Sequence, residues 1–285
     1  MNSVKDTDYL KFLETGEFSD CSITVGLETF NCHKIILASV SEYFWEKLLK
    51  DHILIINCDT LVDPDTFNKF LQYAYSKDEK EFQKYSNYKI MCLFQFGLKC
   101  NMKSIIVICL ELLKTRINGM ELGDLLRLFA FSYDVDNLEL RKATVQNLKK
   151  HLPDAKNCFE ALHFTPNVFE RYIEATKKVL SEVERFKLID AYISMNRHEK
   201  SSTIDEVTNG FDTADERNEN PKSKKLIIDD IRKSSYVQKL LNLIDFQLMD
   251  GSDFYNVVGK SDLLTDQEKF EKLYLCSNSS SDGEN

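Results

Sequence analysis

The spacing of apolar residues changes from a strand period to a helix period within a single short segment near the N-terminus. Ile23 and Val25 alternate with polar neighbours, which is typical of a half-buried strand. Gly26 permits a tight turn, after which residues 28–30 can return as a second strand. Beyond the hairpin the apolar residues recur every three or four positions, as on one face of a helix. The segment therefore predicts a β-hairpin that leads directly into helices.

The first long helix after the hairpin is expected to begin at Ser41, whose hydroxyl suits an N-cap position. Glu42 adds negative charge to its first turn, where it is favoured by the helix dipole. The apolar residues predicted to share one face of this helix are Phe44, Trp45, Leu48 and Leu49.

Four further elements follow in the N-terminal part of the chain. Residues 53–57 are apolar enough for a third strand, and a helix is predicted over 64–75, with Asp63 as its cap. The charged stretch 77–86 is predicted to be a loop. Two helices are expected within 88–113.

Two separated blocks of the chain resemble a BTB/POZ domain. The first is the hairpin and helices over 18–44, and the second is the segment 67–76, in which a Phe precedes a Leu-x-Tyr-x-Tyr helix end. The resemblance implies an α+β fold, a small sheet with helices, over residues 1–114. It also implies a domain that binds proteins and catalyses no reaction.

The remainder of the chain resembles an all-α BACK domain. Ala130, Tyr133 and Leu138 stand where that family has its Ala, Tyr and Leu signature. The segment 181–192 is similar to its Glu-x-x-x-Phe-x-Ala-x-x-x-Trp helix, with Leu188 in place of Ala and Tyr192 in place of Trp, and both substitutions are expected to keep a buried apolar position. The motif at 244–249 resembles a late BACK motif, with Asp245 where relatives have Arg and Gln247 where they have Pro. The predicted division is a BTB/POZ domain over 1–114, a first BACK part over 115–196, a disordered insertion over 197–225, a second BACK part over 226–276 and a disordered tail over 277–285. No Kelch-type repeat follows in this sequence.

Homodimerisation is the first activity that the resemblance implies, through an isologous contact between two copies. The interface residues it implies are Tyr9, Leu10, Leu13, Asp20, Lys34 and Phe44. Asp20 and Lys34 match a charged pair of the family, with Lys where many relatives have Arg. The alternative for this pair is an ordinary internal ion pair with no special role.

Binding to a cullin scaffold is the second implied activity. Relatives commonly carry a hydrophobic-x-Glu motif between the helix that contains Phe44 and the next strand, and this loop is short here. Leu49 and Asp51 are the candidate cullin contacts that remain. The resemblance predicts a homodimeric adaptor that links an unknown client protein to a cullin-RING E3 ubiquitin ligase. The alternative is a scaffold dimer of BTB and BACK domains with no ligase role.

Composition argues against nucleic acid and membrane partners. The net charge of -9 disfavours broad binding to phosphate backbones, which requires clustered Lys and Arg. The longest apolar stretch, 105–110, is too short to span a bilayer, and residues 1–10 lack the apolar run of a signal peptide. We therefore expect a cytoplasmic protein. Lys222, Lys224 and Lys225 leave nuclear import open, although the end of a solvated linker explains them as well.

No residue pattern predicts a catalytic, cofactor or metal site. The eight cysteines contain no Cys-x-x-Cys and no finger-type pairing with His, so we expect reduced thiols rather than zinc. Gly259-Lys260-Ser261 imitates the end of a phosphate-binding loop, but Phe254 occupies the position of the first Gly. His33 is expected to be a structural histidine bonded to backbone.

Overall fold

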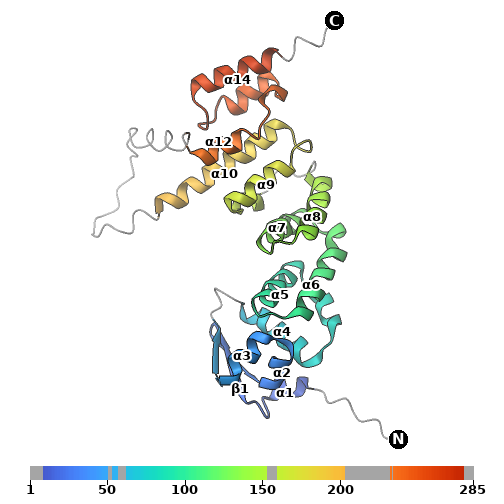
Figure 1. The fold of residues 1–285 in the computed structure, drawn as a ribbon. Coiled ribbons are helices and arrows are strands. Elements are labelled where there is room, and N and C mark those ends of the chain that lie inside the picture. The colour runs from blue at the N-terminus through green and yellow to red at the C-terminus, as the bar shows by residue number, and fades with distance from the viewer. Residues whose placement is uncertain are drawn as a thin grey trace, which may run out of the picture. The chain divides into compact units, whose positions relative to one another are not determined.

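A computed structural model describes residues 9–50, 53–56, 62–152, 159–202, 232 and 234–278. The chain divides into two compact units, Met1–Thr144 and Val145–Asn285, and each is described by itself. Figure 1 shows the order of the elements along the chain. The predicted boundary between the BTB and BACK domains near residue 114 stays a prediction.

The first unit combines a small sheet with helices. Its elements are α1 (Leu10–Thr15), β1 (Cys21–Val25), β2 (Glu28–Cys32), α2 (Lys34–Val40), α3 (Glu42–Lys50), β3 (Ile53–Ile56), α4 (Pro64–Ser76), the 3-10 helix η1 (Glu79–Lys84), α5 (Asn87–Lys99), α6 (Lys103–Arg116), the 3-10 helix η2 (Ile117–Gly119), α7 (Leu122–Asp134) and the start of α8 (Leu138–His151).

The sheet in the described part of this unit has the strand order β2-β1-β3. β1 pairs antiparallel with β2, with Ile23 opposite Phe30, and parallel with β3. Ile23 and Val25 are fully buried, and Gly26 takes a positive φ of 59° in the two-residue turn. The predicted hairpin and third strand are confirmed.

The helix starts follow the capping signals in the sequence. The Phe44 N–H donates to Ser41 Oγ at 3.2 Å, and that hydroxyl donates to the Cys100 carbonyl at 2.7 Å. At the start of α4, Asp63 Oδ1 accepts from the Thr66 N–H at 2.9 Å. Both predicted N-caps are confirmed, and the Ser41 cap also ties α3 to the end of α5.

The core of the first unit is rich in phenylalanine. Phe44, Phe67, Phe70 and Phe96 are fully buried. Phe44 stacks on Phe70 with ring centroids 5.7 Å apart, and Phe70 meets Phe96 edge to face at 5.4 Å. This cluster joins α3, α4 and α5 into one packed core.

The segment 77–86, predicted to be a loop, contains the 3-10 helix η1. Asp78 caps it, because its carboxylate accepts from the Lys80 N–H at 2.9 Å. Arg116, from the end of α6, donates to the carbonyls of Gln83 at 2.8 Å and Tyr85 at 2.7 Å. A charged stretch is therefore held in regular structure by a side chain remote in sequence.

Every regular element described in the second unit is a helix or a helical turn. Beyond the end of α8 it contains the 3-10 helix η4 (Phe159–His163), α9 (Pro166–Ala175), α10 (Glu182–Ser202), α12 (Ser235–Leu241), the 3-10 helix η6 (Phe246–Leu248), α13 (Gly251–Asp253), the π-helical turn η7 (Phe254–Val258) and α14 (Asp266–Asn278). The predicted α+β fold class, with a helical C-terminal part, is confirmed.

Some expectations for the helical region need correction, and others fall outside the described residues. The predicted insertion begins too early, because α10 continues through 197–202, which are polar but compatible with a helix. The rest of the insertion, the Lys222 cluster and the tail from residue 279 lie outside the described residues. Leu138, which belongs to the predicted BACK signature, is exposed, whereas Leu140 and Leu148 are buried.

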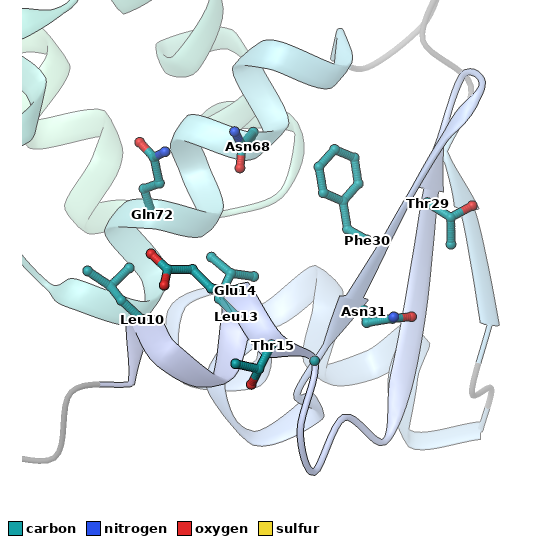
Figure 2. A pocket seen from close by; sticks show the side chains of 10 residues that line it. Leu10, Leu13, Glu14, Thr15, Thr29, Phe30, Asn31, Asn68 and Gln72 are labelled. Atoms are coloured by element: carbon teal, nitrogen blue, oxygen red, sulfur yellow. The ribbon is translucent and has the colours of Figure 1, made fainter.

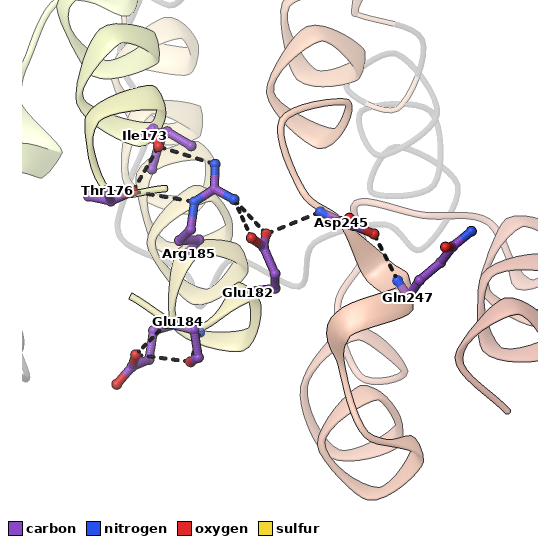
Figure 3. A network of polar contacts seen from close by, with 8 residues as sticks. Ile173, Thr176, Glu182, Glu184, Arg185, Asp245 and Gln247 are labelled. Atoms are coloured by element: carbon purple, nitrogen blue, oxygen red, sulfur yellow. Dashed lines mark hydrogen bonds and ion pairs between the residues drawn. The ribbon is translucent and has the colours of Figure 1, made fainter. Parts of the chain in front are cut away.

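A buried ion pair joins the two sequence halves of the second unit (Figure 3). Arg185 is fully buried and donates from Nη1 to both carboxylate oxygens of Glu182. Its other nitrogens reach the Ile173 carbonyl at 3.2 Å and Thr176 Oγ1 at 3.3 Å. Glu182 also accepts from the Asp245 N–H at 3.1 Å, so α10 is bonded to the segment that leads into η6.

Tyr192 keeps the buried position expected of it. Its ring stacks on Phe169 with centroids 3.7 Å apart, and its hydroxyl donates to the Phe164 carbonyl at 2.9 Å. Tyr192 therefore fills the place that Trp takes in the BACK family, and its hydroxyl has a hydrogen-bond partner.

Candidate functional site

An apolar hollow of about 200 Å³ opens on the surface of the first unit, where α1 meets the start of α2. Its lining is Tyr9, Phe12, Phe18, His33, Ile35, Ile36 and Tyr75. Three of these side chains are largely exposed: Tyr9 by 48%, Ile35 by 77% and Phe18 by 82%. Exposed large apolar side chains gathered at one place mark a surface that gains free energy when it is covered.

His33 fixes the base of this hollow. Its ring lies between Glu17 and Tyr75, with Nε2 2.8 Å from the Glu17 carbonyl oxygen and Nδ1 2.8 Å from the Tyr75 hydroxyl. The main-chain N–H of His33 also donates to the Tyr75 hydroxyl, at 2.9 Å. These contacts confirm the prediction of a structural histidine bonded to backbone.

Phe12 packs edge to face on two of the lining rings, at 6.1 Å from His33 and 5.8 Å from Phe18. The hollow is thus bordered by a set of aromatic rings in mutual contact. Because His33 and Tyr75 are held by hydrogen bonds, this part of the surface is formed before any partner binds.

The predicted interface residues of α1 lie on two different sides of the helix. Tyr9 borders the apolar hollow. Leu10 and Leu13 are half-buried and line a second hollow, which α1 shares with β2 and α4. Figure 2 shows this second hollow, with both leucines on α1 beneath it.

Phe44 was predicted to contact a second copy, and this prediction is wrong. Its side chain is fully buried in the phenylalanine cluster of the core, so it has no surface to offer to a second copy. The resemblance implied this position as an interface contact, but its apolar side chain serves the core of a single chain.

Asp20 and Lys34 come together through the main chain. The exposed Asp20 carboxylate accepts from the Lys34 N–H at 2.8 Å, where it faces the N-terminus of α2. The Lys34 ammonium donates to the Leu48 carbonyl at 2.7 Å, near the end of α3. Asp20 is exposed and Lys34 is half-buried, so loss of the Asp20 carboxylate does not leave a fully buried cation.

A family model described as the BTB/POZ domain matches residues 9–117. Residues 9–117 form a BTB/POZ domain. The chain is 22% identical to Kelch-like protein 41a of Danio rerio over 205 residues, which is 68% of this chain and 32% of the relative. It is 29% identical to Kelch-like protein 40 of Mus musculus over 107 residues, which is 37% of this chain and 16% of the relative. The chain therefore spans about a third or less of the length of these relatives.

A solved structure, the BTB domain of zebrafish PATZ1, is 28% identical and covers 38% of this chain and 86% of its own, with a TM-score of 0.33. The match to Kelch-like protein 41a extends over more residues than a BTB/POZ domain occupies. A BTB/POZ domain is a protein-interaction domain.

The helix α3 of the BTB/POZ domain divides its apolar residues between core and surface. Phe44 and Leu48 are buried, whereas Trp45 is 55% and Leu49 is 67% exposed. Trp45 and Leu49 are four residues apart and therefore neighbours on the helix. Leu49 is available as a cullin contact, and Asp51 lies outside the described residues.

Phe18 and Ile35, the exposed lining residues besides Tyr9, are not among the six individual interface residues predicted. Ile35 stands in the run 35–37, and a run of three apolar residues wraps too far around a helix for all of them to face one core. Leu37 takes the core position and Ile35 points outward. The run 35–37 is therefore the sequence signal that could have predicted an exposed apolar residue on this helix. Phe18 has a positive φ of 62°, which its sequence does not indicate.

The cysteines of the described residues are free thiols. Burial raises the pKa of Cys21 to about 11 and that of Cys109 to about 12. Such thiols stay protonated and are poor nucleophiles near neutral pH. Within the described ranges, no helix is both long and apolar enough to cross a membrane.

Proposed function

We propose that the BTB/POZ domain forms a homodimer and that the apolar hollow lies at the centre of the contact. The observation that carries this proposal is the exposure of Tyr9, Phe18 and Ile35 around one preformed depression. In a two-fold contact the same patch serves both copies, so each of these exposed apolar side chains is covered in both copies of the chain. Each side chain of this kind contributes about 1.5–3 kcal/mol when fully buried.

Asp20 and Lys34 support this interface by positioning α2. The Asp20 carboxylate holds the first N–H of the helix that carries Ile35, and the Lys34 ammonium bonds α2 to the end of α3. Their role in dimerisation is therefore indirect, through the placement of Ile35.

We further propose that the dimer is an adaptor that links a client protein to a cullin-RING E3 ubiquitin ligase. The exposed pair Trp45 and Leu49 on α3 supports this role, because it offers a second apolar surface apart from the lining of the hollow. Similarity to Kelch-like proteins supports it as well. Residues 115–196 and 226–276, which we propose to form a split BACK domain, would hold or orient the client.

Light scattering on the purified full chain tests dimerisation. The wild type is expected at twice the chain mass of 33.1 kDa, and Ile35→Asp at the mass of one chain. Leu27→Asp is the matched control, because Leu27 is fully exposed at the hairpin turn and does not line the hollow. An Ile35→Asp protein that stays dimeric would contradict the proposed interface.

Binding of the purified cullin that BTB adaptors use, measured by calorimetry, tests the ligase role. Leu49→Ala is expected to weaken binding about tenfold or more, which corresponds to about 1.4 kcal/mol, whereas Leu27→Ala has no effect. Asp51→Ala tests the second predicted contact. A folded dimer that does not bind the cullin would favour the scaffold alternative.

A further inference from the structure

The second hollow of the BTB/POZ domain lies between α1, the outer edge of β2 and α4, and we call it the strand-edge groove (Figure 2). Its volume is about 440 Å³, within the range of ligand-binding clefts. Leu13 and Phe30 supply apolar surface, and Phe30 is braced by Phe67 of α4, with ring centroids 5.2 Å apart. The proposed dimer and ligase roles assign nothing to this groove.

β2 turns unpaired main-chain groups toward the groove. In the described part of the sheet, β1 is the sole neighbour of β2, so the other side of β2 is an edge. Residues of an antiparallel pair alternate between bonding their partner strand and pointing away from it. Because Val25 and Glu28 close the two-residue turn, Thr29 and Asn31 are the residues whose N–H and C=O groups point away from β1. Both residues line the groove.

The wall opposite the strand edge carries side-chain amides. Asn68 and Gln72 of α4 both line the groove, and they are four residues apart on the same helix face. An amide both donates and accepts hydrogen bonds, as a peptide group does. The Gln72 side-chain carbonyl faces the Tyr85 hydroxyl at 3.4 Å, which leaves its two N–H donors for other partners.

The charge at the groove is negative. Lys11 and Lys69 each lie one position from a lining residue, and Lys69 is paired with Asp65. Glu14 is the one charged residue in the lining, and Glu17 and Glu28 also lie one position from a lining residue. All three glutamate side chains are exposed. This charge favours a ligand with basic side chains.

We propose that the strand-edge groove binds an extended peptide segment with basic side chains, which pairs with the outer edge of β2. The peptide main chain bonds Thr29 and Asn31, as in other cases where a peptide adds a strand to a sheet edge. One side of the peptide faces Leu13 and Phe30, and its Lys or Arg side chains reach Glu14.

Phage display of random heptapeptides on the full chain tests this proposal. The recovery of clones selected on the wild type is then measured on the Asn31→Pro variant. This substitution removes an outward main-chain N–H of β2 and leaves its pairing with β1 intact. Individual clones are then measured by fluorescence anisotropy. We expect enrichment in Lys and Arg, a 3- to 10-fold loss of affinity in Asn31→Pro, and a 2- to 5-fold loss in Glu14→Gln that shrinks at high salt. Lys11→Gln, on α1 outside the lining, is expected to bind as the wild type does.

A second measurement keeps the test independent of how well Asn31→Pro folds. The best clone is resynthesised with N-methyl groups on alternate residues, in both registers, and tested on unchanged protein. One register is expected to abolish binding and the other to retain it. Failure to enrich any clone, enrichment without basic residues, or equal binding of both registers would overturn the proposal. Protection of the Thr29 and Asn31 amides from hydrogen exchange that disappears in Ile35→Asp would also overturn it, because a second copy would then occupy the groove.

Discussion

Arg185 and Glu182 form an ion pair that is almost completely excluded from water, with side chains exposed by 1% and 8%. The guanidinium has partners for Nε, Nη1 and Nη2, and the carboxylate also holds the Asp245 N–H. A buried pair of this kind is strongly destabilising to break, because the remaining charge has no solvent to replace its partner.

We predict that Glu182→Gln lowers the free energy of unfolding by about 3–5 kcal/mol, measured by urea denaturation of the full chain. Glu174→Gln is the control, since the Glu174–Arg171 pair has the same helical spacing but is exposed to solvent. This variant is expected to lose no more than about 1 kcal/mol. Equal effects of the two substitutions would contradict the role of the buried pair.

The start of α4 is predicted to weaken the first unit in acid. Burial acts to raise the pKa of Asp63, but hydrogen bonds from Thr66 and Lys89 lower it overall, and the Lys89 hydrogen bond lowers the pKa of Asp65. In the unfolded chain both carboxyls have higher pKa values, so the unfolded state takes up protons first and acid favours unfolding. The stabilisation is therefore complete at neutral pH and is lost below about pH 4.

Melting temperatures of the wild type and Lys89→Met across pH 2–7 test this prediction. Both carboxylates are partly exposed, so we expect the free energy of unfolding of Lys89→Met to be lower than that of the wild type by no more than about 1 kcal/mol at pH 7. The difference is expected to vanish once both carboxyls are protonated. Lys80→Met serves as the control, and a difference independent of pH would count against the ionic contribution.

Asp20 is predicted to act as a hydrogen-bond acceptor for α2. Asp20→Ala is expected to cost about 0.5–2 kcal/mol, the range for loss of a helix cap, whereas Asp20→Asn retains an acceptor oxygen and is expected to cost a few tenths. Thermal unfolding at several protein concentrations measures both variants. If Asp20→Asn and Asp20→Ala lower the free energy of unfolding equally, the negative charge of Asp20 stabilises this region, and not its hydrogen-bond acceptor oxygen.

Local signals predicted the N-terminal fold well. The hairpin, the Ser41 cap and the Asp63 cap each depend on residues close in sequence, and all three were predicted correctly. The division of α3 into a buried side with Phe44 and an exposed side with Trp45 was not predictable in this way, because it depends on where α4 and α5 pack.

The second unit shows the same limit. Glu182 and Arg185 are three residues apart, a spacing that is usual for a solvated pair on a helix surface. Only the contacts with Ile173 and Asp245, which are remote in sequence, reveal that this pair is buried. The end of α10 was missed for a related reason, since polar composition alone does not end a helix.

The six-residue helix α1 forms a wall shared by two hollows, with Tyr9 and Phe12 toward one and Leu10 and Leu13 toward the other. So short a helix cannot shift on one side without moving the other. Any shift of α1 that a protein seated against Tyr9 produces would therefore change the affinity for a peptide seated against Leu13, and thermodynamic linkage requires the reverse effect to be equal in size.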